Sequence, residues 1–108
     1  MRMSALICFC TCPGHDLADR IAATLVEERL AACVSLLPGV RSVYRWEGRV
    51  EAADEVLLLL KTTVEAYPRL QERLRELHPH ELPELLAVEP ALGLPAYLAW
   101  IADETRKD

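Results

Sequence analysis

The 108-residue sequence predicts an α+β fold of the split β-α-β (ferredoxin-like) type, an antiparallel sheet with two helices on one face. Three observations predict it. Short apolar runs of β-compatible residues alternate with longer segments of helical periodicity. Proline and glycine separate these segments, and their order is strand, helix, strand, strand, helix, strand and a terminal helix. We expect residues 1–108 to form a single domain, because this length suits one core.

The first strand and helix follow from apolar spacing. Residues 5–11 are continuously apolar or β-compatible and predict a buried strand, which Pro13-Gly14 ends. Asp16 is expected to cap the following helix. In that helix, apolar side chains recur at helical spacing at Leu17, Ile21, Leu25 and Leu30.

A long hairpin is predicted next. Residues 32–37 and 40–46 have β character, and we interpret Pro38-Gly39 between them as a bulge or kink in one long strand. Glu47-Gly48 then predicts a tight turn, after which the chain returns as a third strand ending near Thr62.

The second half of the chain supplies the remaining elements. A helix is predicted up to about Leu77, with either Thr63 as its cap or Pro68 in its first turn. Prolines at 79 and 83 end it, residues 85–88 predict a fourth strand, and a short helix is expected from Pro95 to about Glu104.

Two features predict an oligomer. Residues 56–60 are apolar on both faces of the third strand, although the helices cover only one face of the sheet. The hairpin strands are also too long for a small sheet. Both features are explained if the bare face and the hairpin contact other subunits.

Composition restricts the classes of function. The formal net charge is −5 and no basic stripe exists, which argues against nucleic acid as a partner. No apolar run is long enough to span a bilayer, so we expect a cytoplasmic protein with free thiols. The sequence has no glycine-rich phosphate loop and no Gly-x-Ser-x-Gly motif, and we therefore expect no catalysis. The enzymatic alternative is a thiol site built on Cys12 and His15.

Thiols and imidazoles suggest a transition-metal site. Cys8, Cys10 and Cys12 alternate along the first strand and share one face, while two histidines and two glutamates lie within residues 78–84. The structural alternative is that Cys8 and Cys10 are small buried side chains. On this interpretation Cys33 is a core thiol, and the histidines interact with the end of a helix. Cys12, beside a loop, is expected to be the most exposed and reactive thiol.

Several motifs resemble the CutA family of divalent-cation-tolerance proteins. The matching segments are TCP at 11–13, LAACV at 30–34, PG at 38–39, SVYRWEG at 42–48, KTT at 61–63, HP at 78–79, PE at 83–84 and YLAW at 97–100. The resemblance implies a trimer similar to PII signalling proteins, with the sheets facing inward. It also implies a role in tolerance of copper and other divalent metals.

The resemblance implies candidate ligands as well. The copper ligands proposed in the family fall on Cys10, Leu77 and His78, so leucine replaces one histidine. His80 stands where aromatic residues are more usual in the family and offers a replacement imidazole. We therefore expect copper, or another divalent cation, at Cys10 and His78, with weaker candidates Cys12, His80 and Glu84.

The alternative function is a PII-like signalling or scaffold trimer. Such a trimer would bind a small anion or a protein partner at the cleft between subunits. Lys61 and Arg45 are the candidate cations for an anion there.

Overall fold

A computed structural model describes residues 4–107 and confirms the predicted order of elements. The elements are β1 (Ala5–Cys12), α1 (His15–Glu27), β2 (Cys33–Trp46), β3 (Arg49–Thr63), α2 (Tyr67–Leu77), β4 (Leu86–Val88) and α3 (Pro95–Glu104).

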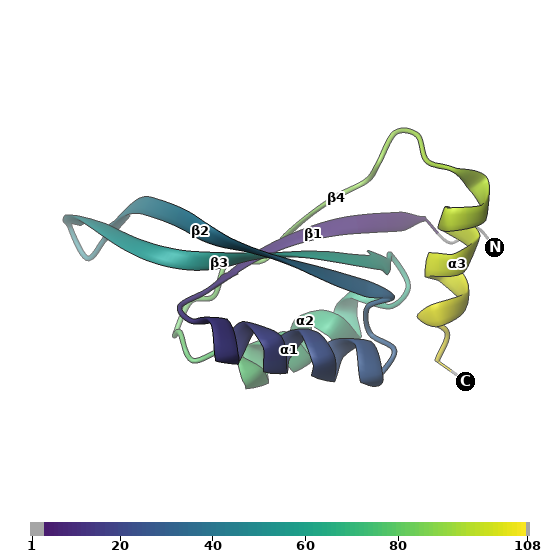
Figure 1. Cartoon of the computed structure of the whole chain (residues 1–108), viewed down its shortest axis with the longest axis horizontal. Coiled ribbons are helices and arrows are strands. Elements are labelled where there is room, and N and C mark those ends of the chain that lie inside the picture. The colour runs from purple at the N-terminus through teal and green to yellow at the C-terminus, as the bar shows by residue number, and fades with distance from the viewer. Residues whose placement is uncertain (1–3, 108) are drawn as a thin grey trace.

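The sheet has the strand order β2-β3-β1-β4, and every neighbouring pair is antiparallel. Helices α1 and α2 lie side by side beneath one face, and α3 lies at the end of the sheet (Figure 1). The β2-β3 hairpin extends well beyond the two helices. The observed arrangement is the predicted α+β fold with both long helices on one face.

The hairpin is continuous through Pro38-Gly39, as predicted. The β2-β3 register shifts between Leu37 and Val40, which marks a bulge, and Gly39 takes a φ of 82°. At the tip, Glu47 and Gly48 have φ values of 50° and 79°. Two consecutive positive φ values suit the right-handed twist of a two-residue hairpin turn.

The core lies between the sheet and the two helices; we call this side of the sheet the covered face. Odd and even positions of a strand point to opposite faces, and the register places Cys10 opposite Leu58 and Cys8 opposite Leu60. Buried side chains of both layers meet here: Cys8, Cys10, Cys12, Ala18, Ile21, Leu25, Val56, Leu58, Leu60, Leu70 and Leu74.

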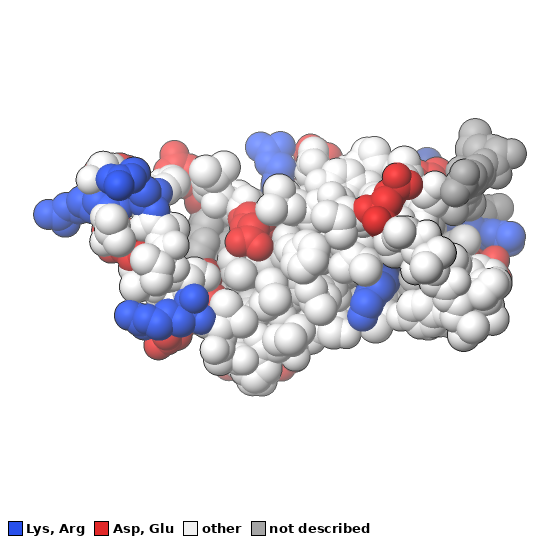
Figure 2. Space-filling model, turned by 90° about the horizontal axis from the view of Figure 1, so that it is seen from above, with Lys and Arg blue, Asp and Glu red and all other residues white. Residues whose placement is uncertain are grey.

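The other side, the open face, also carries apolar side chains. Phe9 pairs with both Leu59 and Leu86 across neighbouring strands, and Leu57 lies two positions before Leu59. The structure leaves Leu86 65% exposed and Val88 49% exposed. Charged side chains are few over the middle of this face and denser at the hairpin end (Figure 2). Nothing in the described residues 4–107 covers the open face as α1 and α2 cover its opposite.

Two predictions about α1 are wrong. Gly14, not Asp16, is the N-cap, and Asp16 lies in the first turn without a capping hydrogen bond. There its carboxylate still interacts favourably with the positive end of the helix dipole. Leu30 lies outside the helix, which ends at Glu27, because Arg29 turns the chain with a φ of 60°. Leu30 nevertheless remains buried.

The start of α2 uses both predicted signals, but neither residue is the N-cap. Ala66 occupies that position, and Pro68 lies in the first turn. The Thr63 hydroxyl accepts a hydrogen bond from the Ala66 N–H at 3.2 Å. Thr63 therefore stabilises the entry to the helix from one turn earlier.

Candidate metal centre

The three β1 thiols lie on the covered face, and none of them is exposed to solvent. The prediction that Cys12 is the most exposed thiol is therefore wrong. The strand is one residue longer than predicted, since β1 still pairs with β3 at Cys12 opposite Val56. The pairing of Cys12 with Val56 keeps the Cys12 side chain on the covered face, where it is buried.

His78 is the C-cap of α2 and is 94% buried, with 6% of its surface exposed. Its backbone N–H donates to the Leu74 carbonyl at 2.9 Å. Its ring Nε2 lies 2.8 Å from the Thr11 carbonyl oxygen. The pairing between β1 and β4 ends at Phe9 opposite Leu86, so β4 does not extend to Thr11. The His78 imidazole and the Cys10 thiol, which lies 3.8 Å away, are the side-chain partners of the Thr11 carbonyl.

Hydrogen bonds define the tautomer of His78. The His80 backbone N–H donates to Nδ1 at 3.1 Å, so Nδ1 is an acceptor. The ring proton is then on Nε2, which donates to Thr11. The buried ring is a neutral imidazole, which is the form that ligates metal ions.

Cys10, Cys12 and His78 form one cluster. The two sulfurs and a ring nitrogen of His78 all lie within 4.8 Å of one another. Typical metal–ligand bonds are roughly 2.0–2.3 Å, so these donors would close by about 1 Å around a bound ion. The structure thus brings together both principal predicted ligands, Cys10 and His78, with the weaker candidate Cys12.

The two thiols of the cluster have opposite acidities. The Cys10 thiol donates to the Thr11 carbonyl at 3.8 Å. The neighbouring Cys12 sulfur raises the pKa of Cys10, and burial raises it further. Interaction with the Cys10 thiol lowers the pKa of Cys12. Cys12 is therefore the sulfur of the pair that more readily becomes a thiolate, the form that binds metal. Cys8, outside the cluster, has a pKa raised to about 11 by burial.

The remaining predicted ligands lie outside the cluster. The His80 ring is exposed and sits against the His78 ring, with centroids 4.8 Å apart. Glu84 is exposed, and its charge contributes to the raised pKa of Cys10. Leu77 lines a small cavity with α1 residues that include Leu17 and Ile21. Leu77, the position at which the resemblance implied a second histidine ligand, therefore packs between the helices.

Cys33 is not the core thiol that the sequence predicted. It lies on the open face opposite Lys61 and is half-buried. The Lys61 Nζ donates to the Ser35 hydroxyl at 3.0 Å and lies 3.8 Å from the Cys33 sulfur. Among residues 4–107, Lys61 forms no ion pair with a carboxylate.

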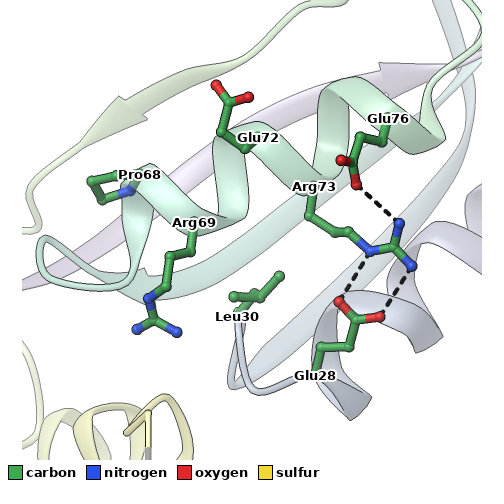
Figure 3. A pocket seen from close by; sticks show the side chains of 7 residues that line it. All are labelled: Glu28, Leu30, Pro68, Arg69, Glu72, Arg73 and Glu76. Carbon is green, nitrogen blue, oxygen red and sulfur yellow. Dashed lines mark hydrogen bonds and ion pairs between the residues drawn. The ribbon is translucent and has the colours of Figure 1, made fainter.

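A second concave surface lies between the end of α1 and α2 (Figure 3). This open groove, of about 410 Å³, contains Arg73, whose guanidinium binds the Glu28 carboxylate at 3.0 and 3.1 Å and Glu76 at 3.1 Å. These hydrogen bonds raise the pKa of Arg73. The cation is already paired, and the groove shares no residue with the thiol cluster.

Comparison with known proteins identifies the family. The family model described as "CutA1 divalent ion tolerance protein" matches residues 6–104. The chain belongs to this family. The divalent-cation tolerance protein CutA of Thermus thermophilus is 50% identical over 95 residues, covering 88% of this chain and 92% of that protein. Protein CutA of Mus musculus is 43% identical over 97 residues, and the match covers 90% of this chain but 55% of the mouse protein.

Solved CutA1 structures share the fold. A Thermus thermophilus structure superposes with a TM-score of 0.92 at 46% identity, covering 94% of this chain and 99% of that one. CutA1 from Oryza sativa gives a TM-score of 0.93 at 34% identity, covering 97% and 96%. The predicted fold and family resemblance are both confirmed. In residues 4–107, no helix is both long enough and apolar enough to cross a bilayer.

Proposed function

We propose that this CutA1 family member acts in metal tolerance by binding copper at Cys10, Cys12 and His78. Membership of the divalent ion tolerance family supports the metal role. The choice of copper and of these ligands is our proposal. The observation that carries it is the buried cluster of two thiols and a neutral imidazole.

The donor set favours copper as Cu(I). Sulfur ligands select soft ions, and imidazole also suits copper. Structural zinc is held by four ligands in nearly all cases. Among the described residues the cluster contains three donors, all of them buried. Three buried donors suit an ion of low coordination number better than tetrahedral zinc.

We further propose a cytoplasmic homotrimer that binds metal without turnover. The apolar open face and the projecting hairpin are the surfaces available for contact between subunits. All four cysteines are free, which is consistent with a reducing compartment.

The test is a competition titration of the reduced protein against a chromophoric Cu(I) chelator. Cys10→Ser should weaken Cu(I) binding by more than about 100-fold, since loss of a residue that only orients a ligand already costs about 10- to 100-fold. Cys8→Ser is the matched control, because Cys8 lies on the same face of the same strand, is equally buried and is outside the cluster. Equal Cu(I) affinity in wild type and Cys10→Ser would exclude the site.

The second candidate is a PII-like signalling or scaffold trimer that binds an anion or a protein partner. It is favoured by Lys61, a cation on the apolar open face with a hydroxyl as its hydrogen-bond acceptor. The double variant His78→Ala, His80→Ala separates the two candidates. Lost Cu(I) affinity in an intact assembly supports the metal site. Unchanged Cu(I) affinity, together with phosphate binding that Lys61→Met abolishes, supports the anion site.

A further inference from the structure

Both ring nitrogens of His78 are engaged. Nδ1 accepts the His80 backbone N–H at 3.1 Å, and Nε2 donates to the Thr11 carbonyl at 2.8 Å. A nitrogen that ligates a metal ion must present its lone pair to that ion. An ion can therefore bind this imidazole only after at least one of the two hydrogen bonds has broken.

A metal ion can bind His78 through either Nε2 or Nδ1, and the two choices break different hydrogen bonds. Ligation through Nε2 would move the ring proton to Nδ1, where it would face the N–H of His80; both hydrogen bonds would then be lost. Ligation through Nδ1 breaks only the bond from His80. It keeps the bond from Nε2–H to the Thr11 carbonyl, the kind of contact that orients most metal-bound histidines.

We infer that the backbone N–H of His80 gates the cluster and leaves Nδ1 of His78 when Cu(I) enters. This inference rests on the metal site proposed above. Thr11 acts as a positioning residue, because its carbonyl holds the imidazole while the ion replaces the amide. Uptake of the ion thus opens the segment that follows His78.

The segment after His78 is suited to such a movement. Residues 79–84 form neither helix nor strand, and Leu82 is 71% exposed. They lead into β4, which has only three residues, all exposed. The hydrogen bond from His80 connects this exposed segment to the buried ring. Few other interactions hold the segment, so it can move once that hydrogen bond is broken.

The direct test is amide hydrogen exchange at His80, measured by NMR on reduced ¹⁵N-labelled full-length protein with and without one equivalent of Cu(I). We expect exchange at His80 to accelerate by at least about 10-fold on binding, while amides of the central strand β3 stay protected. Saturable Cu(I) binding with unchanged exchange at His80 would overturn the gate and leave the metal site intact. Failure to bind Cu(I) at all would overturn both.

A variant pair tests the same inference by affinity. His80→Pro removes the N–H and leaves Nδ1 free, so Cu(I) binding should tighten by about 2- to 10-fold, the usual value of one hydrogen bond. Glu81→Pro stiffens the same exposed segment but keeps the N–H of His80, and its affinity should stay within about 2-fold of wild type. Equal tightening in the two variants, or none in a folded His80→Pro protein, would contradict the gate.

Discussion

The two faces of the sheet have similar sequences and different environments. On β3, Leu58 and Leu60 are fully buried on the covered face, while Leu57 and Leu59, between and beside them, are only half-buried on the open face. Helices α1 and α2 account for the difference, because they lie against one face only (Figure 1). The same contrast separates the thiols, since Cys8, Cys10 and Cys12 are on the covered face and Cys33 is on the open face.

The covered and open faces of the sheet are suited to different functions. On the covered face the thiols are buried away from solvent, and two of the sulfurs lie close to the His78 imidazole. The open face exposes an apolar surface that a single chain leaves in contact with water, which favours association with further copies. We therefore propose that metal binds on the covered face and that subunits associate through the open face.

The largest expected effect comes from a charge on the open face. Leu59→Asp places a carboxylate in the middle of the proposed contact between subunits, where burying it is costly. Light scattering should then give the mass of a single 12.1 kDa chain in place of a trimer. Gln71→Asp, on the exposed side of α2, is the control and should leave the mass unchanged. A Leu59→Asp protein that keeps the wild-type mass would contradict association through the open face.

Truncating leucines on the two faces should have different consequences. Leu58→Ala leaves a cavity in the chain's own core and should lower the free energy of unfolding by about 2–5 kcal/mol. If copies cover the open face, the cost of Leu59→Ala depends on assembly and should change with protein concentration. Urea unfolding at two concentrations measures both costs. A cost for Leu59→Ala that is the same at both concentrations would count against coverage by other copies.

The buried Cys8 predicts a loss of stability at alkaline pH. Burial raises its pKa from about 9 to about 11, so the folded protein holds this proton more tightly than the unfolded chain does. Its stabilisation is complete below about pH 9 and is lost as the pH rises through about 11, by about 2 kcal/mol.

Urea unfolding of wild type and Cys8→Ala at about pH 8 and about pH 11 isolates this contribution. The free energy of unfolding should fall more steeply with pH for the wild type than for the variant. Parallel pH profiles would show that Cys8 is not held in the dry environment that the covered face provides.

Alkylation should distinguish the thiols by face. If the wild type associates through its open face, iodoacetamide should label none of the four cysteines rapidly at neutral pH. In Leu59→Asp it should label Cys33, which the open face leaves half-buried, but not Cys8, Cys10 or Cys12. Labelling in denaturant, where all four react, is the control. Early labelling of Cys12 in the folded protein would contradict its burial.

Much of the fold could be predicted from the sequence because its signals are local. Pro38-Gly39 and Glu47-Gly48 mark the bulge and the turn, and both were located correctly. The errors come from tertiary context. Leu30 fits the helical spacing, but it lies outside α1 because Arg29 has a positive φ, which turns the chain away from the helix. Asp16 is a good cap residue, but the chain enters the helix at Gly14.

The candidate site was predictable in its residue types but not in its geometry. Alternation along the strand placed Cys10 and Cys12 on one face, yet the depth of Cys12 depends on one extra strand pair with Val56. The position of Cys33 depends on the register with Lys61, which no local pattern fixes. The hydrogen bond from His80 to His78 depends on the backbone path after α2, for which the sequence offers only the restraint of Pro79.

Native mass spectrometry of the reduced protein with increasing Cu(I) measures copper uptake and the number of subunits together. We expect a trimer that takes up one copper ion per subunit at low excess, and loss of this uptake in Cys10→Ser but not in Cys8→Ser. A graded series of copper adducts that is identical in the wild type and the Cys10→Ser variant would contradict this expectation.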